Sequence, residues 1–381
     1  MYLKSDVNEY FMKNRVLLDN IIFNLQEYGG ISNYWYNLIK ESEGNNHIFY
    51  FEDNDYSNKN YYRNSLKLPT DFIIKDKSKN PLKIKRYLPV KMTEKSFDVF
   101  HSSYYRYAKG NIKNVITVYD FMYEKYFSKY NIRRLIHSFQ KYQAIKYSNY
   151  IIGISKNTLN DMLKYFPEFK SKKKEVVYLG INQEFYPIKI KRKFIKIQNY
   201  KLYDNSYFLY FGNRKSYKNF KFLIFAYSSL LKNNKDKNIP CLVVAGGGAF
   251  SKEEIRLLRE NDILSSTIKL KNIDNAELNL LYNYCSGFIY PSLYEGFGLP
   301  VIEAMKAGAP VICSNSSSIS EVAGEAAILF DPSNVFALEK SLFELLNNNT
   351  RKDIIKLGLA QSVKFSWNKM YKETSEIYDS L

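Results

Sequence analysis

The most informative stretch of the sequence is Tyr290-Pro291-Ser292-Leu293-Tyr294-Glu295-Gly296-Phe297-Gly298-Leu299-Pro300-Val301-Ile302-Glu303-Ala304-Met305. Its pattern predicts a strand that ends at Tyr290, a turn bared by Gly296 and Gly298, and a helix over 300–307 that begins with Pro300. Free N–H groups at such a helix start attract anions. Glu295 in the turn and Glu303 in the helix can accept hydrogen bonds from the hydroxyls of a sugar and a ribose. A merely capping or ion-paired Glu303 is the structural alternative.

Strands and helices alternate on both sides of this stretch. The second half predicts strands at 207–211, 241–245, 267–270, 287–290 and 310–313, with helices at 219–231, 252–261, 275–284, 300–307, 334–346 and 351–365. The first half predicts strands at 16–22, 97–101, 115–119 and 150–154, with helices at 32–40, 132–146 and 157–165. Such alternation predicts doubly wound parallel α/β sheets.

The 381 residues are enough for two such domains. We predict an N-terminal domain at 1–188, a linker at 189–206, a C-terminal domain at 207–365, and a last helix at 366–381 that packs back on the first domain. Residues 52–80 lack a sustained period and predict a surface excursion. Ligands bind beyond the carboxyl ends of parallel strands, so we expect the site in a cleft between the two domains.

Two other elements of the second domain predict a phosphate-bearing ligand. Arg214 and Lys218 lie in a turn between a strand and a helix, where arginine can grip two phosphate oxygens and lysine supplies a point charge. Taken alone, this turn is better explained as a solvated basic loop. Gly246-Gly247-Gly248 follows the next strand and allows a close backbone approach, although it lacks the spacing of a dinucleotide fingerprint.

These motifs, with Ala307-Gly308-Ala309-Pro310-Val311 and Glu321-Val322-Ala323-Gly324, resemble glycosyltransferase family 4, whose members are retaining GT-B enzymes. The resemblance covers the whole second domain. It is fainter in the first domain, where it rests on Gly29-Gly30-Ile31, on Ile154-Ser155-Lys156-Asn157-Thr158, and on Asp120 with Glu124. Tyr119-Asp120 stands where many relatives have His-Asp. Tyr119 either contacts the sugar or only packs, and His101 and His137 are alternatives for the missing histidine.

The resemblance implies a GT-B enzyme, with two Rossmann-like domains, that takes a hexose from a nucleotide diphosphate sugar. Arg214 and Lys218 would balance the charge of the leaving diphosphate, Glu295 would position the sugar, and Asp120 belongs to the acidic motif. The donor-binding residues it implies are Gly30, Ser155, Gly246, Gly247, Gly298, Leu299 and Glu303. No cofactor and no metal are expected. Asp53-Asn54-Asp55 has the form of a metal-binding Asp-x-Asp motif, but it lies in the excursion and predicts a solvated loop.

The stretches 211–219 and 290–295 together resemble the mannosyltransferase-like branch of the family. This implies GDP-mannose or a related GDP-deoxysugar as donor, and UDP-sugars stay open. The acceptor that the resemblance implies is a glycan, growing on a lipid carrier, for cell-surface polysaccharide such as O-antigen.

Charge is distributed unevenly along the chain. Residues 1–200 hold 35 Lys+Arg against 19 Asp+Glu, or +16, whereas the remaining residues sum to +2. A nucleic-acid-binding protein is the rival interpretation, but most tyrosines fall inside helix and strand patterns, so we expect no nucleic acid partner. The segment 125–146 predicts a basic amphipathic helix for an anionic membrane surface, with an ordinary surface helix as the alternative.

Location follows from the cysteines and the N-terminal residues. Cys241, Cys285 and Cys313 are far apart and without ligand spacing, which is typical of reduced packing residues in a cytosolic protein. Residues 1–15 lack the apolar core of a secretory signal. We therefore expect a cytoplasmic protein that is peripheral on the inner face of the cell membrane.

Overall fold

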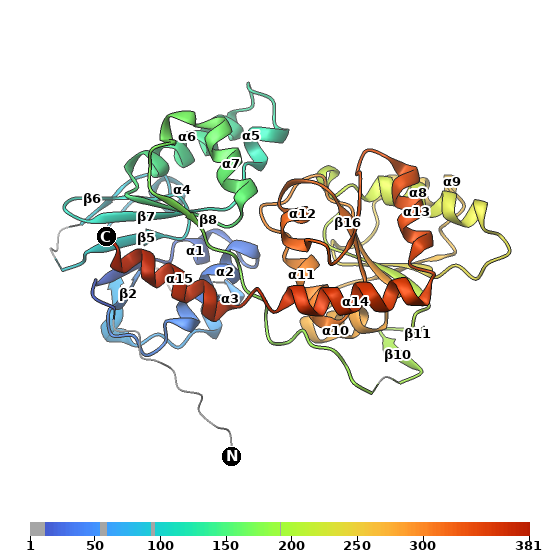
Figure 1. Ribbon diagram of the computed structural model, residues 1–381. Coiled ribbons are helices and arrows are strands. Elements are labelled where there is room, and N and C mark those ends of the chain that lie inside the picture. The colour runs from blue at the N-terminus through green and yellow to red at the C-terminus, as the bar shows by residue number, and fades with distance from the viewer. Residues whose placement is uncertain (1–11, 54–58, 93–95, 191) are drawn as a thin grey trace, which may run out of the picture. The chain divides into compact units, whose positions relative to one another are not determined.

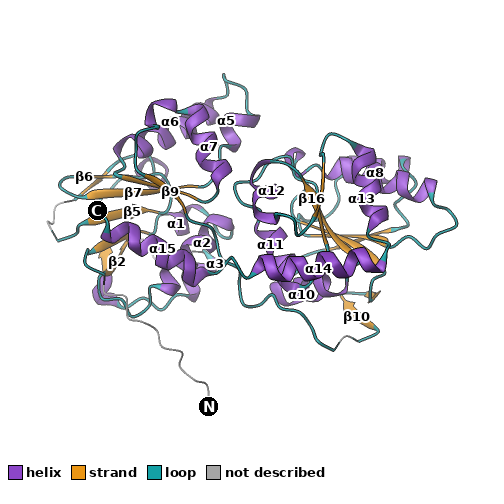
Figure 2. Ribbon diagram, viewed as in Figure 1, coloured by secondary structure: helices purple, strands orange, loops and turns teal. Residues whose placement is uncertain are grey.

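The computed structural model describes residues 12–53, 59–92, 96–190 and 192–381, which form two compact units. The first unit contains the described residues up to Ile154, Thr158–Tyr178 and Trp367–Leu381. The second unit contains Ser155–Asn157 and Leu179–Ser366. Each unit has its own parallel sheet with helices on its faces, as Figure 2 shows.

The sheet of the first unit has seven parallel strands in the order β3-β2-β1-β5-β7-β8-β9. Its central strands are apolar and buried, as expected for a parallel sheet covered on both faces. The strands are β1 (Val16–Asp19), β2 (Ile48–Glu52), β3 (Ile73–Lys75), β5 (Val99–Ser102), β7 (Lys113–Val118), β8 (Tyr150–Gly153) and β9 (Lys174–Val176).

Most helices of the first unit follow these strands in sequence. They are α1 (Ile22–Leu25), α2 (Gly30–Glu41), α3 (Tyr61–Ser65), α4 (Leu82–Lys85), α5 (Met122–Tyr126), α6 (Ile132–Tyr147) and α7 (Lys156–Tyr165). A short pair, β4 (Val90–Lys91) with β6 (Ala108–Lys109), lies apart from the main sheet.

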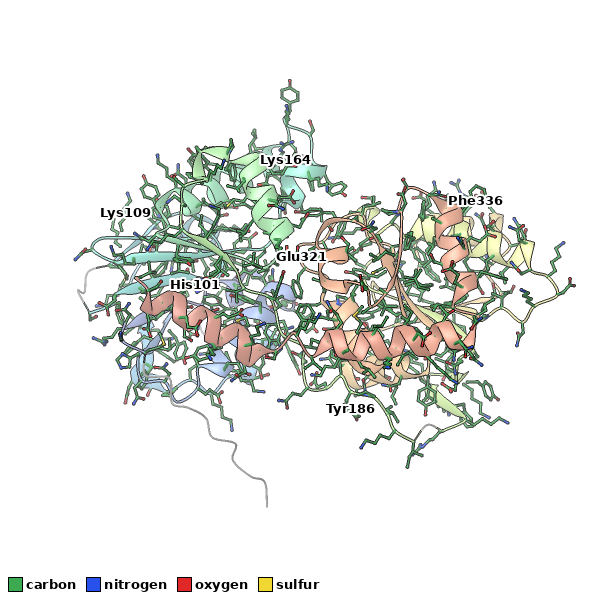
Figure 3. The ribbon with its side chains drawn as sticks, in the orientation of Figure 1. His101, Lys109, Lys164, Tyr186, Glu321 and Phe336 are labelled. Atoms are coloured by element: carbon green, nitrogen blue, oxygen red, sulfur yellow. The ribbon has the colours of Figure 1, made fainter. Side chains whose placement is uncertain are left out.

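The last helix, α15 (Trp367–Asp379), belongs to the first unit and packs on α2. Figure 3 shows His101 beside this helix, and its Nδ1 lies 2.6 Å from the Tyr378 hydroxyl. Both side chains are fully buried. The chain therefore returns to its first unit through a packed aromatic and polar contact.

The sheet of the second unit has six parallel strands in the order β14-β13-β12-β15-β16-β17. The strands are β12 (Tyr207–Phe211), β13 (Cys241–Ala245), β14 (Thr267–Leu270), β15 (Gly287–Tyr290), β16 (Val311–Ser314) and β17 (Ile328–Phe330). The helices are α8 (Phe220–Asn233), α9 (Lys252–Glu260), α10 (Asn275–Tyr284), α11 (Leu299–Ala307), α12 (Ser317–Ala323), α13 (Val335–Glu344) and α14 (Asn348–Ser362). The predicted α/β class with doubly wound sheets is confirmed.

Residues 189–206, expected to be a linker, contain an antiparallel hairpin of β10 (Phe194–Ile197) and β11 (Tyr200–Tyr203) that packs on α10. Ile195, Ile197 and Leu202 are buried beneath it. Because lysines stand between these apolar residues, the alternation of buried and exposed side chains was not recognised as two strands in the sequence. Among the described helices, none combines the length and hydropathy that crossing a membrane requires.

Candidate active site

The loop between β15 and α11 carries Glu295 and is fixed by serine side chains. The Ser317 hydroxyl accepts a hydrogen bond from the Glu295 amide at 3.0 Å. The Ser318 hydroxyl donates to the carbonyls of Glu295 and Phe297, at 2.8 and 3.0 Å. Ser317 adopts a positive φ of 50°, a conformation that costs free energy for a residue other than glycine. The structure therefore holds this loop in one shape before any ligand binds.

Lys218 and Glu295 form an ion pair at the carboxyl ends of the second sheet. The Lys218 Nζ lies 2.6 Å from Glu295 Oε1 and 2.9 Å from the Tyr290 hydroxyl. The two charged side chains are only 12% and 15% exposed, so water screens their charges weakly. Burial and the neighbouring Glu295 carboxylate raise the pKa of Tyr290, which stays a neutral hydroxyl. The predicted cation and the predicted sugar-positioning carboxylate are therefore brought together.

Arg214 supports the glycine loop. Its Nε lies 2.6 Å from Glu254 Oε1, and its two terminal nitrogens donate to the carbonyls of Gly246 and Ala249 at 3.0 and 2.7 Å. A Cβ on Gly247 would lie 2.8 Å from Arg214 Nη1, which explains why the position is glycine. These contacts occupy most of the guanidinium. Its pairing with a diphosphate therefore stays a prediction that requires a rearrangement here.

Lys269 on β14 was not recognised from the sequence. Its Nζ donates to the carbonyls of Gly246 and Leu270, so it ties the glycine loop to the end of β14. Burial, with a smaller contribution from the nearby Arg214 guanidinium, lowers its pKa to about 8. A lysine within a strand has no motif that marks it; only its position next to β13 in the sheet reveals its role.

Glu303 lies on α11 and, within the described part of the chain, makes no hydrogen bond or ion pair. Burial raises its pKa from 4.5 to about 8, and the Glu184 carboxylate contributes in the same direction. The capping and ion-pairing alternative for Glu303 thus finds no support. A desolvated carboxyl group without donors is suited to accept hydrogen bonds from a ligand.

The start of α11 offers two backbone donors. Gly298 has a φ of 104°, which favours glycine, and Pro300 occupies the first helical turn as predicted. Within the described residues, the amides of Gly298 and Leu299 donate to no acceptor. Two open N–H groups at a helix N-terminus form a ready site for an anion.

Three of the predicted residues follow strands of the first sheet. Asp120 follows β7, and its Oδ1 accepts from the Met122 amide at 3.1 Å. Gly30 begins α2, and a Cβ added there would meet no atom within 4 Å. Ser155, just after β8, is fully buried and is grouped with the second unit. Asp120 and Gly30 belong to the first unit and Glu295 to the second, so their roles toward one donor stay predictions.

The contacts of Tyr119 favour the packing alternative. Its ring is buried against Tyr34 and Tyr105, and its hydroxyl donates to the Ser103 carbonyl at 3.1 Å. Tyr119 is therefore a packing residue. His101 is no substitute, because both ring nitrogens are engaged and burial lowers its pKa to about 3.

No described group of His, Cys, Asp and Glu side chains has the arrangement of a metal site. Asp53 pairs with Lys85 at 3.0 Å, while Asn54 and Asp55, the rest of the Asp-x-Asp motif, lie outside the described residues.

Comparisons with known proteins fit this geometry. Residues 191–361 match the family described as "Glycosyl transferases group 1". The O-antigen chain mannosyltransferase B of Escherichia coli is 33% identical over 187 residues, which are 49% of each chain. The O-antigen chain mannosyltransferase RfbU of Salmonella typhimurium is 26% identical over 57% of this chain and 56% of the relative. The chain thus spans about half the length of these curated relatives.

Solved structures share the fold over nearly the whole chain. Sucrose-phosphate synthase from Thermosynechococcus elongatus has a TM-score of 0.70 at 17% identity. The superposition covers 96% of this chain and 98% of the synthase chain. HepE of Anabaena, solved with UDP and glucose, has a TM-score of 0.67 at 13% identity, with 97% and 100% covered. Residues 191–361 therefore resemble the group 1 glycosyltransferases, mannosyltransferases are among the similar proteins, and the chain has the GT-B fold.

Proposed function

We propose that this chain is a retaining family 4 glycosyltransferase that moves a hexose from a nucleotide diphosphate sugar to a glycan acceptor. The observation that carries the proposal is the shielded Lys218–Glu295 pair beside two open amides at the start of α11. Such a cluster presents positive charge to a diphosphate and a fixed acceptor to the hydroxyls of a sugar. Glu303, which has no protein donor, supplies a second acceptor for the ribose.

The proposed transfer breaks the bond between the sugar's anomeric carbon and the diphosphate oxygen. Lys218 and the amides of Gly298 and Leu299 balance the charge that develops on that oxygen. The acceptor hydroxyl attacks the anomeric carbon from the same face, and its proton passes to the leaving diphosphate. Glu295 orients the sugar hydroxyls, so no protein nucleophile is required. Arg214 acts mainly by holding the glycine loop.

The donor that we propose first is GDP-mannose or a related GDP-deoxysugar, because the relatives named above are mannosyltransferases. A UDP-sugar is the alternative, since HepE shares the fold and was solved with UDP. We propose that the acceptor is a lipid-linked glycan of a cell-surface polysaccharide such as O-antigen, in keeping with the names of the same relatives.

An anionic membrane surface is a further proposed partner. Ile132 and Phe139 on α6 are 70% and 64% exposed, so part of the apolar face of this helix lies at the surface and is not buried in the core. Lys129, Arg133 and Lys146 are exposed in the same segment. One lysine of the segment 125–146 is excluded from this surface: Lys141 is buried and pairs with Glu124 at 3.0 Å. We propose a cytoplasmic enzyme that binds peripherally to the inner face of the membrane through this helix.

Calorimetry with GDP and UDP, followed by product analysis with GDP-mannose and UDP-glucose, tests the donor assignment. We expect one nucleotide to bind and its sugar to be transferred with retained configuration. Lys218→Ala should weaken both. Binding and turnover that are unchanged in Lys218→Ala would remove the basis of the proposal. Flotation with anionic and neutral vesicles tests the membrane partner: attachment should require the anionic lipid and fall with salt.

A further inference from the structure

Whereas the proposed donor residues Lys218, Glu295 and Glu303 belong to the second unit, the first unit contains a groove of its own. Its volume is about 690 Å³ and its lining is largely apolar. One wall is formed by Leu135, Ile136 and Phe139 of α6, and the other includes Tyr87 and Leu88. In Figure 1, α6 lies on the outside of the first unit. The α6 side chains in this wall are 43–64% exposed, so the groove opens to solvent with apolar walls.

The Arg86 side chain stacks on residues at the edge of this groove. The Arg86 guanidinium lies over the rings of Tyr87 and Tyr104, with its Cζ 5.0 and 5.3 Å from their centroids. Tyr87 lines the groove, and Tyr104 packs on Tyr105, which also lines it. Within the described residues, the guanidinium donates no hydrogen bond and forms no ion pair, and its Nε is buried without an acceptor. An arginine is always charged, so this arrangement is costly unless a ligand completes it.

Gln140 provides the second polar atom of the groove. Its side chain is 5% exposed, and its Nε2 donates to the Arg86 carbonyl at 2.8 Å. This bond fixes α6 to the residue that carries the guanidinium. The Gln140 Oε1 is buried without a donor, and the residue lines the groove. The apolar groove thus has a buried amide oxygen without a donor in its lining, and the Arg86 guanidinium lies next to its lining residue Tyr87.

We propose that this groove binds a single-chain amphipathic phosphate, with the alkyl chain along α6 and the phosphate on Arg86. A guanidinium stacked on aromatic rings is preorganised to form two hydrogen bonds to a phosphate. Apolar walls of this volume suit an alkyl chain better than a free sugar. Under the proposed function, on which this identification alone rests, the ligand is the lipid phosphate that carries the acceptor glycan.

Calorimetry on the full chain tests this with decyl phosphate below its micellar concentration. Decanol and inorganic phosphate, each carrying half of the proposed chemistry, are the comparison ligands. We expect decyl phosphate to bind at least tenfold more tightly than either. Arg86→Gln should weaken it roughly tenfold to a hundredfold, the value of a charge-assisted hydrogen bond. Phe139→Ser, which shortens the apolar wall, should also weaken it.

Lys164→Gln is the matched control, because Lys164 is an exposed cation of the same unit on α7. Its affinity for decyl phosphate should stay within twofold of the parent. GDP and UDP binding by each variant shows that the chain is folded, and it separates this proposal from the donor assignment.

Three results would overturn the inference: equal binding of decanol, an Arg86→Gln variant that binds like the parent, or no binding of decyl phosphate. Attachment to anionic vesicles without binding of decyl phosphate would also overturn it, because the face would then meet only the bilayer surface.

Discussion

Binding of the nucleotide should release a proton from Glu303. The free site holds this carboxyl group with a pKa of about 8, because burial disfavours its charged form. At pH 7 roughly nine in ten molecules therefore carry the proton, whereas at pH 9 roughly one in ten does. The two hydroxyls of a ribose donate to an ionised carboxylate and stabilise it, so the pKa falls in the complex. The affinity should accordingly rise about tenfold from pH 7 to pH 9 and level off above the free pKa.

Calorimetry in buffers of different ionisation enthalpy measures this proton directly. We expect about 0.9 protons released per bound nucleotide at pH 7, and far fewer at pH 9. Lys269 titrates in the same range, and the loss of its charge would oppose the rise in affinity. Glu303→Gln keeps Lys269 and the nucleotide unchanged, so the difference between parent and variant isolates Glu303. Equal proton release by both proteins would refute the assignment of Glu303 to the ribose.

The same carboxyl group should reduce stability at high pH. Its folded pKa lies above the unfolded value, so the folded state favours the neutral form and stability falls as the pH rises from 4.5 to about 8. Glu303→Gln should therefore raise the melting temperature more at pH 8 than at pH 5. This readout needs no ligand, and it tests the shift in pKa independently of any function.

Four further predictions concern the other site residues. Lys218→Ala should lower nucleotide affinity or turnover roughly tenfold to a hundredfold. Glu295→Gln should abolish turnover and keep nucleotide affinity within a few-fold of the parent. Calorimetry measures the affinities, and product assays measure the turnover. Gly247→Ala should lower the melting temperature more than Gly248→Ala, because both have positive φ but only Gly247 lacks room for a Cβ. Gly30→Ala meets no neighbour, so it should keep the parent's melting temperature while turnover falls; unchanged turnover would show that no substrate approaches this backbone.

Local patterns in the sequence were sufficient to predict the second unit. The strands at 207–211, 241–245, 267–270 and 287–290 agree with β12, β13, β14 and β15, because apolar runs bounded by turn residues mark buried parallel strands. The residue pattern around Glu295 also predicted the turn after β15 and the helix α11 that follows it. By contrast, β17 and α12 were missed, because each is short and its period is incomplete.

The supports of the site could not be predicted. Glu254 belongs to an ordinary capping box in the sequence, yet its carboxylate also pairs with Arg214 forty residues away. Likewise, Ser317 and Ser318 are part of a polar run whose hydroxyls prove to hold the Glu295 loop. Such contacts join separate strand ends, and a single sequence carries no signal of which side chains the topology brings together.

The charges of the donor site cancel almost completely. Arg214 is balanced by Glu254, and Lys218 by Glu295, each at 2.6 Å. What remains is Lys269, whose charge burial weakens, and the open amides at the start of α11. A diphosphate that enters is therefore attracted at short range, by groups already aimed at it, and not by a long-range field. The strongly basic half of the chain lies outside the proposed donor site, so its charge is available to another anion, for which the first unit offers Arg86 and the exposed cations of α6.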